Sequence, residues 1–446
     1  MERERLSSRL GFILLSAGCA IGCGNVWKFP WMVGQNGGAA FVLIYFIFLA
    51  LLGLPALIME FSLGRASQAS PVKMYQKLER PGQKWHIHGY ICLFGNIALM
   101  AFYTVVTGWF IYYFVSFLTG HASAPDFNFV AMISNAKVNV IYLFISVALC
   151  FAILTRNLQS GLERITKVMM VLLLVLMTVL AVRSITLPGG KEGLAFYLVP
   201  DFKKIKLSSI VSAMNQAFFT LSLGIGAMAI FGSYIGKEHS LMGESIKIII
   251  LDTFVAITAG LIIFPACSAY GQTVDAGPSL LFNTMTTVFN NMAGGRIWGS
   301  IFFLFMIFAA FSTELTVCEN ILACVRELTG WSRLKGCLIC GTGIFLISLT
   351  TALGYSVFHF QPFAEGTAWL DFWDFIVSNN LLPLGSLVFA LFWCTKLGAG
   401  WPALMQEANE GKGMKVKNWM KIIFAWFVPI CIIAIYIIGL ITFNWK

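Results

Sequence analysis

Apolar runs long enough to cross a lipid bilayer recur along the whole chain, and short polar connections separate them. No stretch between them is long enough for a separate soluble domain. The pattern predicts an all-α integral membrane protein with about eleven transmembrane helices. We expect them near residues 11–33, 39–62, 88–118, 138–155, 165–184, 209–234, 246–268, 297–325, 337–357, 368–395 and 420–442.

The distribution of basic residues predicts how these spans are oriented. Lys and Arg are concentrated in alternate connections, and such residues are retained on the cytoplasmic side during insertion. We therefore expect a multi-pass protein of the cell inner (plasma) membrane, with a cytoplasmic N-terminus and an external C-terminus. Segment 273–293 is too polar to span, and we predict a helical hairpin there that lies over the extracellular mouth.

Composition agrees with a membrane protein. Hydrophobic residues make up 58% of the chain and charged residues 11%, and the mean hydropathy is +0.81. The net charge of +10 then reflects topology, with anionic lipid headgroups as the partner, and nucleic acid is not implied.

Two spans are interrupted by paired glycines, in AIGCGN at 20–25 and in SLGIGA at 222–227, roughly 200 residues apart. One isolated pair could simply allow close helix packing. Two pairs at matching places in two halves favour broken helices, because irregular backbone at membrane depth is tolerated where it lines a cavity. Such a break offers N–H groups for a carboxylate and carbonyl oxygens for a cation. The sequence thus predicts a transporter of a zwitterion and a cation.

Other chemistries find little support. The five histidines do not converge in sequence, which disfavours a membrane enzyme; they are His86, His88, His121, His239 and His359. The eleven cysteines lie mostly within apolar spans and are expected to be free thiols, without a disulfide framework or a cysteine metal site. The N-terminal MERERLSSR leads directly into an apolar span, so no removable signal peptide is expected.

Three strings resemble the neurotransmitter:sodium symporter family, and especially its bacterial eleven-span amino-acid transporters. They are SRLGFILLSAGCAIGCGNVWKFPWMVGQNGGAAF at 8–41, NQAFFTLSLGIGAMAIFGSY at 215–234 and FAAFSTELTVCEN at 308–320. The resemblance implies one transporter domain over 1–446, with inverted repeats at 11–184 and 209–395, discontinuous first and sixth helices, and an eleventh span at 420–442. It also implies sodium-coupled uptake of an amino acid by alternating access.

The resemblance implies two sodium sites made of hard oxygen ligands, which an unhydrated alkali cation requires. The first, which also includes the substrate carboxylate, takes Ala20, Asn25, Thr220 and Asp252. The second takes Gly18, Ile21, Ala309, Ser312 and Thr313. Chloride-dependent members have Asn and Ser where this chain has Asp252 and Ala256, so the fixed charge of Asp252 implies independence of chloride.

The same comparison implies how the substrate is bound. Monoamine carriers of the family have an aspartate at the position of Gly22, so this substrate should bring its own carboxylate. That carboxylate would meet backbone N–H groups near Gly22 and Gly24 and the hydroxyl of Tyr103, while the amine would meet carbonyls near Phe219 and Ser222. The pocket also takes Cys19, Ala20, Cys23, Leu99, Thr220, Ile225, Thr313 and Val317. No formal charge occurs among them, which implies a hydrophobic or aromatic amino acid, and Ile225 and Val317 favour larger side chains.

Gates and supports complete these expectations. Lys28 stands where the family usually has Arg and should pair with Asp374 or Asp371, more loosely because Lys lacks a bidentate fork. The inner gate is expected from Arg3 and Glu327, with a further hydrogen bond from Tyr234, although Leu6 replaces a common Trp. Glu60 should be a buried support bonded to the first broken helix. A non-transporting sensor, which binds without flux, and a channel-like carrier, whose flux does not saturate, remain as alternatives.

Overall fold

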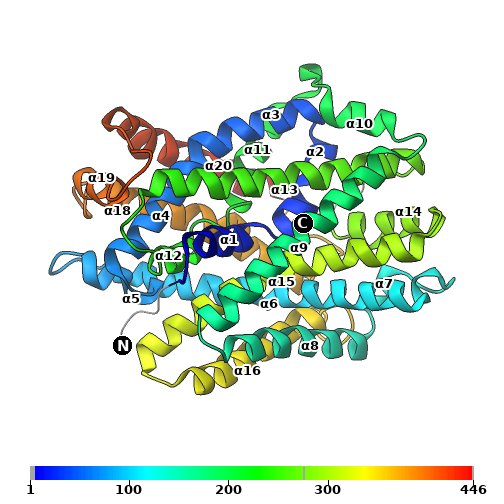
Figure 1. Cartoon of the computed structure of the whole chain (residues 1–446), viewed down its shortest axis with the longest axis horizontal. Helices are drawn as coiled ribbons and strands as arrows, with labels where there is room; N and C mark the ends of the chain where they lie inside the picture. Colours follow the sequence, from blue (N-terminus) through cyan, green and yellow to red (C-terminus); the bar gives the residue numbers. More distant parts are fainter. Residues whose placement is uncertain (1–5, 275–276, 444–446) are drawn as a thin grey trace.

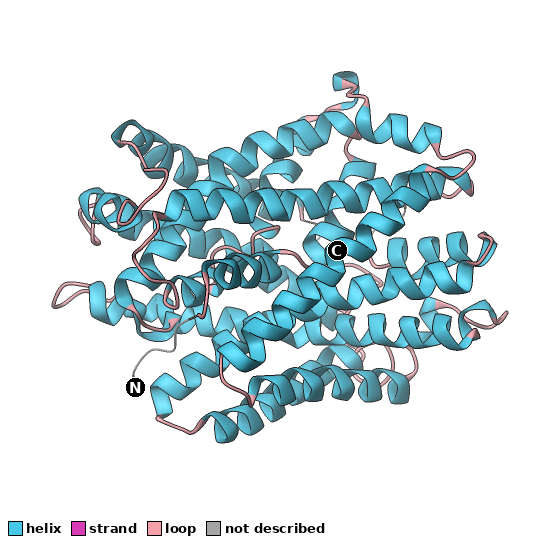
Figure 2. Ribbon diagram, viewed as in Figure 1, coloured by secondary structure: helices cyan, strands magenta, loops and turns pink. Residues whose placement is uncertain are grey.

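The protein is described here by a computed structural model of residues 6–274 and 277–443, in which every regular element of those residues is a helix (Figure 2). Among them, nine helices are long and apolar enough to cross a membrane. One further span, the first along the chain, is broken: it is formed by α1 (Arg9–Ala20) and the continuous η1 (Gly24–Lys28) and α2 (Phe29–Gln35), which are bent by 54° relative to α1. The segments α11 (Leu207–Phe219) and α12 (Ala227–Gly232) form a second broken span. The predicted all-α membrane fold with discontinuous first and sixth spans is confirmed.

The remaining spans differ from the predicted ones by a few residues at most ends. They are Ala39–Ser67 (α3, η2, α4), His86–Thr119 (α6), Ala136–Leu154 (α8), Gln159–Ile185 (η4, α9), Leu241–Ala269 (α13), Gly295–Thr329 (α15), Arg333–Ala352 (α16), Trp369–Cys394 (α17, η7, α18) and Asn418–Ile441 (η8, η9, α20). The end of α15 lies beyond the expected 325 because nothing stops the helix until Gly330, which adopts φ +71°.

Helices from both halves of the chain surround the first broken span (Figure 1). The long helices α6 and α15 pack along each other and carry α8 and α16. Helix α1, seen nearly end-on near the centre of Figure 1, contacts α15, α13 and α9. Helix α12 packs against α4, and α11 against α3. Both breaks therefore lie inside the bundle, where their free backbone groups face other protein atoms rather than lipid.

Shorter helices fill the connections: α5 (Pro71–Leu78), η3 (His121–Ser123), α7 (Phe129–Ile133), α10 (Lys191–Leu198), η5 (Phe202–Lys204) and α19 (Trp401–Ala408). The helical hairpin predicted over 273–293 is wrong. That region contains one continuous helix, η6 (Leu280–Thr284) with α14 (Met285–Asn291), and the turn at Gly277 and Pro278 precedes it. The eleven cysteines are free thiols, including Cys337 and Cys340, which have CxxC spacing within α16.

Candidate functional site

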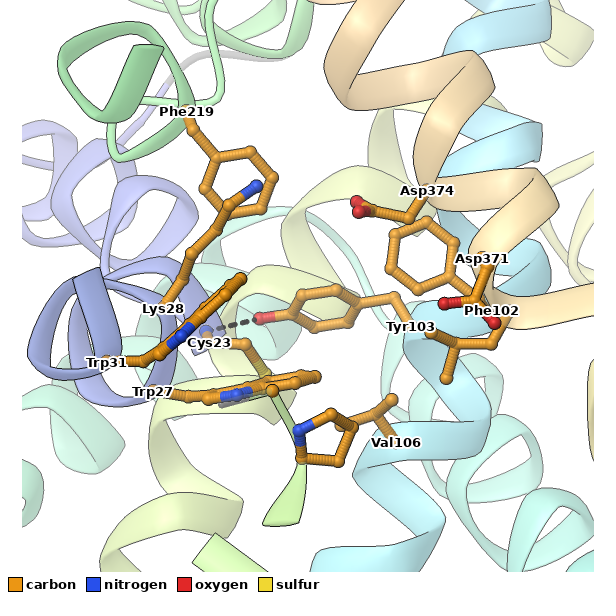
Figure 3. A pocket seen from close by; sticks show the side chains of 13 residues that line it. Cys23, Trp27, Lys28, Trp31, Phe102, Tyr103, Val106, Phe219, Asp371 and Asp374 are labelled. Carbon is orange, nitrogen blue, oxygen red and sulfur yellow. Dashed lines mark hydrogen bonds between the residues drawn. The ribbon is translucent and has the colours of Figure 1, made fainter. Parts of the chain in front are cut away.

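Two hydroxyl groups converge on the backbone at Gly22, in the first break. The Cys23 N–H donates to the Tyr103 hydroxyl over 3.1 Å, which Figure 3 marks with a dashed line. A Cβ built on Gly22 would lie 2.6 Å from Thr313 Oγ1 and closer still to the Tyr103 hydroxyl. Only glycine fits at position 22, and its backbone lies directly against the side chains of Tyr103 in α6 and Thr313 in α15. The N–H groups predicted to hold a carboxylate thus lie beside the predicted hydroxyl.

Three of the residues predicted for the first sodium site form one buried cluster. Asn25 Nδ2 donates to Asp252 Oδ1 over 2.8 Å and lies 3.0 Å from Thr220 Oγ1. The Thr220 hydroxyl donates to Asp252 Oδ2 over 3.0 Å. The Asp252 side chain is fully buried, and no Lys, Arg or His of the described chain forms an ion pair with it. A carboxylate inside a membrane span is costly when it is charged and unpaired. Here it accepts from the Asn25 amide and the Thr220 hydroxyl, and the oxygens of Asp252 and Thr220 are of the type that a hard cation takes.

The residues predicted for the second sodium site also meet. The Thr313 hydroxyl lies 3.2 Å from the carbonyl oxygen of Gly18 and 3.2 Å from that of Ile21. The Ser312 hydroxyl donates to the Ala309 carbonyl over 3.0 Å. Because α1 ends at Ala20, carbonyls of its last turn lack the helical N–H partners that a continuing helix would supply. Hydroxyl and carbonyl oxygens from α1 and α15 therefore face one another in a buried place.

The second break requires unusual backbone conformations. Ser222 has φ +51°, which is rare for a residue with a side chain, and its hydroxyl donates to the Cys19 carbonyl over 3.4 Å. Gly224 has φ +104°, and a Cβ there would overlap the carbonyl of Leu382. Ser222 thus joins the two breaks through one hydrogen bond.

Glu60 is buried as predicted, but the prediction that it supports the first broken helix is wrong. Its carboxylate accepts from the N–H of Gly224 over 3.0 Å and from that of Met228 over 2.8 Å. Both donors belong to the second broken span. The free N–H groups at the start of α12 explain this choice, since a helix N-terminus attracts a carboxylate.

A small cavity lies between the two breaks, and we call it the central cavity. It is lined by Ala20, Gly22, Cys23, Gly24, Leu99, Tyr103, Phe219, Ser222, Thr313, Val377 and Leu382. Four residues predicted for the pocket do not line it: Cys19, Thr220, Ile225 and Val317. Ile225 instead faces Gly95 of α6, and its carbonyl accepts from Asn96. Val377 and Leu382 were not predicted, because their apolar span carries no motif.

A second cavity of about 170 Å³, which we call the vestibule, adjoins the central cavity through Cys23, Tyr103 and Phe219. Lys28, Asp371 and Asp374 line it (Figure 3). No ion pair joins Lys28 to either acid in the described structure. The Lys28 ammonium instead lies 3.6 Å from the centre of the Phe219 ring.

The vestibule acids have partners on their own span. Asp374 accepts from the Ser378 hydroxyl over 2.6 Å, and Asp371 accepts from the Ala368 N–H over 2.7 Å. The predicted outer-gate residues Lys28, Asp371 and Asp374 therefore line the same cavity, but the described structure shows no ion pair between the lysine and either acid.

The predicted inner gate is described only in part. Arg3 lies outside the described residues. Glu327 accepts from the N–H of Ser70 over 2.8 Å, and the Tyr234 hydroxyl donates to Glu319 over 3.3 Å. Glu319 also pairs with Arg333 at 2.5 Å.

Sequence reasoning missed two contacts that attach the start of α1 and the residues just before it to neighbouring spans. Glu163 accepts from the Ser7 N–H over 2.8 Å and from the Ser7 hydroxyl over 2.6 Å. Arg9 pairs with Glu244 of α13 at 2.6 Å. The spacing of Glu163 and Lys167 indicates only a pair along one helix, so it gave no signal of a contact with the start of α1.

Several known proteins are similar to this chain in sequence and in overall structure. The family model described as the sodium:neurotransmitter symporter family matches residues 3–126 and 127–446. The sodium-dependent transporter YhdH of Bacillus subtilis is 34% identical over 448 residues, covering 98% of each chain. A sodium-dependent transporter of Haemophilus influenzae is 32% identical over 457 residues, again covering 98% of each. The crystal structure of MhsT in complex with L-phenylalanine superposes with a TM-score of 0.87 at 34% identity, covering 98% of this chain and 99% of MhsT.

Proposed function

Because the chain belongs to the sodium:neurotransmitter symporter family, we propose that it imports an amino acid with an apolar side chain together with sodium. Membership makes it a multi-pass, sodium-coupled transporter of a small molecule and not an enzyme. The amino-acid substrate, the hydrophobic or aromatic class and the independence of chloride are the proposal. It rests on one observation above all: the Gly22 N–H donates to Asn25 Oδ1 over 3.3 Å, which joins the groups around Gly22 to the buried cluster at Asp252.

The substrate carboxylate would bind at the first break. The Cys23 N–H and the Tyr103 hydroxyl are already aligned there, and the absence of a side chain at Gly22 leaves the approach open. A helix N-terminus begins at Gly24, so its dipole favours a negative group. That the related MhsT was crystallised with L-phenylalanine supports an amino acid with an apolar side chain.

Two sodium ions would be carried together with the amino acid. Thr220 and Asp252 offer side-chain oxygens for the first ion, and the substrate carboxylate would complete the set. Asn25 would contribute its Oδ1, which accepts from the Gly22 N–H in this structure while its Nδ2 donates to Asp252. Gly18, Ile21, Ala309, Ser312 and Thr313 would hold the second, between α1 and α15. Both sets are oxygen-only, as a hard cation requires. Binding of the first ion would therefore depend on the substrate, which is the physical basis of coupling.

Asp252 also supports chloride independence. Its carboxylate supplies a permanent negative charge beside the first sodium site, and Ala256, four residues later on α13, has no hydroxyl for an anion. A chloride ion there would lie near that carboxylate and be repelled. We propose that the fixed charge does the work of a bound anion.

Alternating access would use the vestibule as the entrance. Lys28 and Asp374 would approach when it closes, with Asp371 as the second acid. Arg3, Glu327 and Tyr234 remain proposed for the opposite gate. The two repeats at 11–184 and 209–395, the inner-membrane location, the cytoplasmic N-terminus and the external C-terminus also stay proposals.

Uptake into proteoliposomes tests the function. A labelled apolar amino acid should accumulate only with an inward sodium gradient, saturate with concentration, and be unaffected when gluconate replaces chloride. Competition by twenty amino acids would then rank the substrates. Asp252→Asn should weaken the apparent sodium affinity at least about a hundredfold, because a charge several ångströms away in a dry site is worth a few kcal/mol. Asp201→Asn, an exposed acid, is the matched control.

The alternatives give different results in the same assay. Uptake driven equally by potassium or by a proton gradient alone contradicts sodium coupling. Binding without accumulation indicates a sensor, and flux that does not saturate indicates a channel-like carrier. Transport that stops without chloride overturns the role proposed for Asp252.

A further inference from the structure

The tenth span along the chain, Trp369–Cys394, supplies one wall of the central cavity. Val377 of η7 (Phe375–Leu381) and Leu382 at the start of α18 (Leu382–Cys394) both line it. Their exposed fractions are 0% and 4%, so both are packed inside the protein. The other lining residues come from the two breaks, α6 and α15. The tenth span is thus the one contributor to the cavity that no motif indicated.

A π-helical turn explains why both residues face the cavity. The Leu382 N–H donates to the Val377 carbonyl, which is the five-residue hydrogen bond of a π-helix. Residues five apart therefore lie above one another here. In an α-helix with 3.6 residues per turn they would point to different faces. Local winding, rather than residue type, places the second side chain beside the first.

The cavity lining combines polar and apolar groups. Gly22, Tyr103 and Thr313 gather polar groups at the first break. The lining also contains three aliphatic side chains, Leu99 of α6 with Val377 and Leu382. One turn before Leu99, a Cβ on Gly95 would lie 3.4 Å from Leu381 Cδ1, so α6 and the tenth span touch directly near these side chains.

The backbone of the second break packs directly against the backbone of α18. A Cβ on Gly224 would overlap the Leu382 carbonyl, and a Cβ on Gly385 would overlap the Gly224 carbonyl. Backbone therefore packs on backbone between α18 and the second break. Close-packed backbones cannot give way easily, so the wall limits the space for a substrate side chain.

We infer that Val377 and Leu382 form the side-chain end of the substrate site and that Val377 is a specificity-determining residue that sets its size limit. The inference rests on the proposed amino-acid transport. A substrate with its carboxylate at the Cys23 N–H and Tyr103 would direct its side chain towards Leu99, Val377 and Leu382. The favoured ligand is then an amino acid whose apolar side chain fills this end.

Competition binding to the purified full-length protein tests the inference. Alanine, valine, leucine, phenylalanine and tryptophan would compete with a labelled substrate in sodium buffer, for wild type, Val377→Ala and Val377→Phe. Val377→Ala should shift the ratio of phenylalanine to alanine affinity at least about tenfold towards phenylalanine, since one or two methylenes in an apolar pocket discriminate by this much. Val377→Phe should shift it at least about tenfold the other way. Val388→Ala, the same change on the same span but outside the cavity lining, should keep the wild-type ratio.

Affinity ratios separate specificity from general damage, because a loss of folded protein lowers all five affinities together. If Val377→Phe does not fold, the Val377→Ala ratio and a Val377→Ile variant decide the matter. Parallel profiles for wild type and the folded Val377 variants overturn the inference while leaving amino-acid transport intact. A wild-type protein that binds no amino acid in sodium overturns the proposed function as well.

Discussion

At Gly22 one hydrogen atom in place of a side chain decides what can reach the first break. The Tyr103 hydroxyl and Thr313 Oγ1 both occupy the space that a Cβ would need. One of these hydroxyls belongs to the proposed carboxylate site and the other to the second sodium site. A methyl group at this position would displace both hydroxyls, so a substitution at Gly22 would affect substrate binding and sodium binding together.

Gly22→Ala should therefore lower both substrate affinity and apparent sodium affinity, each by at least about tenfold, since displacing one polar partner costs roughly 1–3 kcal/mol. Scintillation binding at graded sodium concentrations would measure both. Gly343→Ala is the matched control, because a Cβ on that residue of α16 would meet open space. Wild-type binding by a folded Gly22→Ala protein would contradict the carboxylate site.

Sequence reasoning reached some residues of the site and missed others for a physical reason. Asn25, Thr220 and Asp252 could be named because polar groups in apolar spans stand out and because their motifs resemble a family. The structure brings these three together. Val377 and Leu382 look like ordinary lipid-facing or core residues, and only the winding of their span turns them to the cavity.

At the scale of elements, hydropathy predicts spans well but not their irregularities. The glycine pairs predicted both breaks, but glycine is required for different reasons in each. Gly224 and Gly226 adopt left-handed backbone, whereas the side chains of Tyr103 and Thr313 leave no room for a Cβ on Gly22. Nothing in the sequence predicted the π-turns of η4 or η7. The predicted hairpin over 273–293 was wrong because mixed polarity there described one helix packed on other protein.

The start of α1 is an element whose attachment should control access from the predicted cytoplasmic side. Ser7 is bonded to Glu163 of η4, Arg9 is paired with Glu244, and a Cβ on Gly11 would overlap the Glu163 carboxylate. The first turn of α1 therefore lies directly on η4 and is held by side chains from two spans. Loss of either acid should loosen this turn before it affects the rest of the fold.

Glu163→Ala removes the acceptor of the Ser7 bonds and leaves the contact at Gly11 unfilled. Amide hydrogen exchange over residues 7–12 should become about tenfold faster, since each lost hydrogen bond is worth roughly 1 kcal/mol or more. Exchange mass spectrometry would measure it, with Glu192→Ala, an acid of α10 far along the chain, as the control. Unchanged exchange in this segment would show that Glu163 does not hold the start of α1.

At the scale of the whole molecule, the two cavities share one wall. Cys23, Tyr103 and Phe219 line both, so movement of any of these side chains would change both cavities. Lys28 rests on the Phe219 ring while Asp374 lies across the same space (Figure 3). Approach of these charges would carry Phe219 over the substrate. Such a movement would link closure of the vestibule to occupancy of the central cavity, as symport by alternating access requires.

Cys23 reports this linkage, because its thiol lies between the two cavities and none of the other cysteines lines either. Only 6% of the residue is exposed, and because Cys23 lines the vestibule and the central cavity, a reagent from outside would reach it through the vestibule. A membrane-impermeant thiol reagent added outside intact cells should modify Cys23 in sodium-free buffer. Sodium together with substrate should slow this reaction at least about tenfold, because the fraction of protein with an open vestibule should fall to about a tenth of its value without them. Peptide mass spectrometry would quantify the adduct, and Cys23→Ala would identify the background from other thiols. Equal modification with and without sodium and substrate would mean that the vestibule does not close over a bound amino acid.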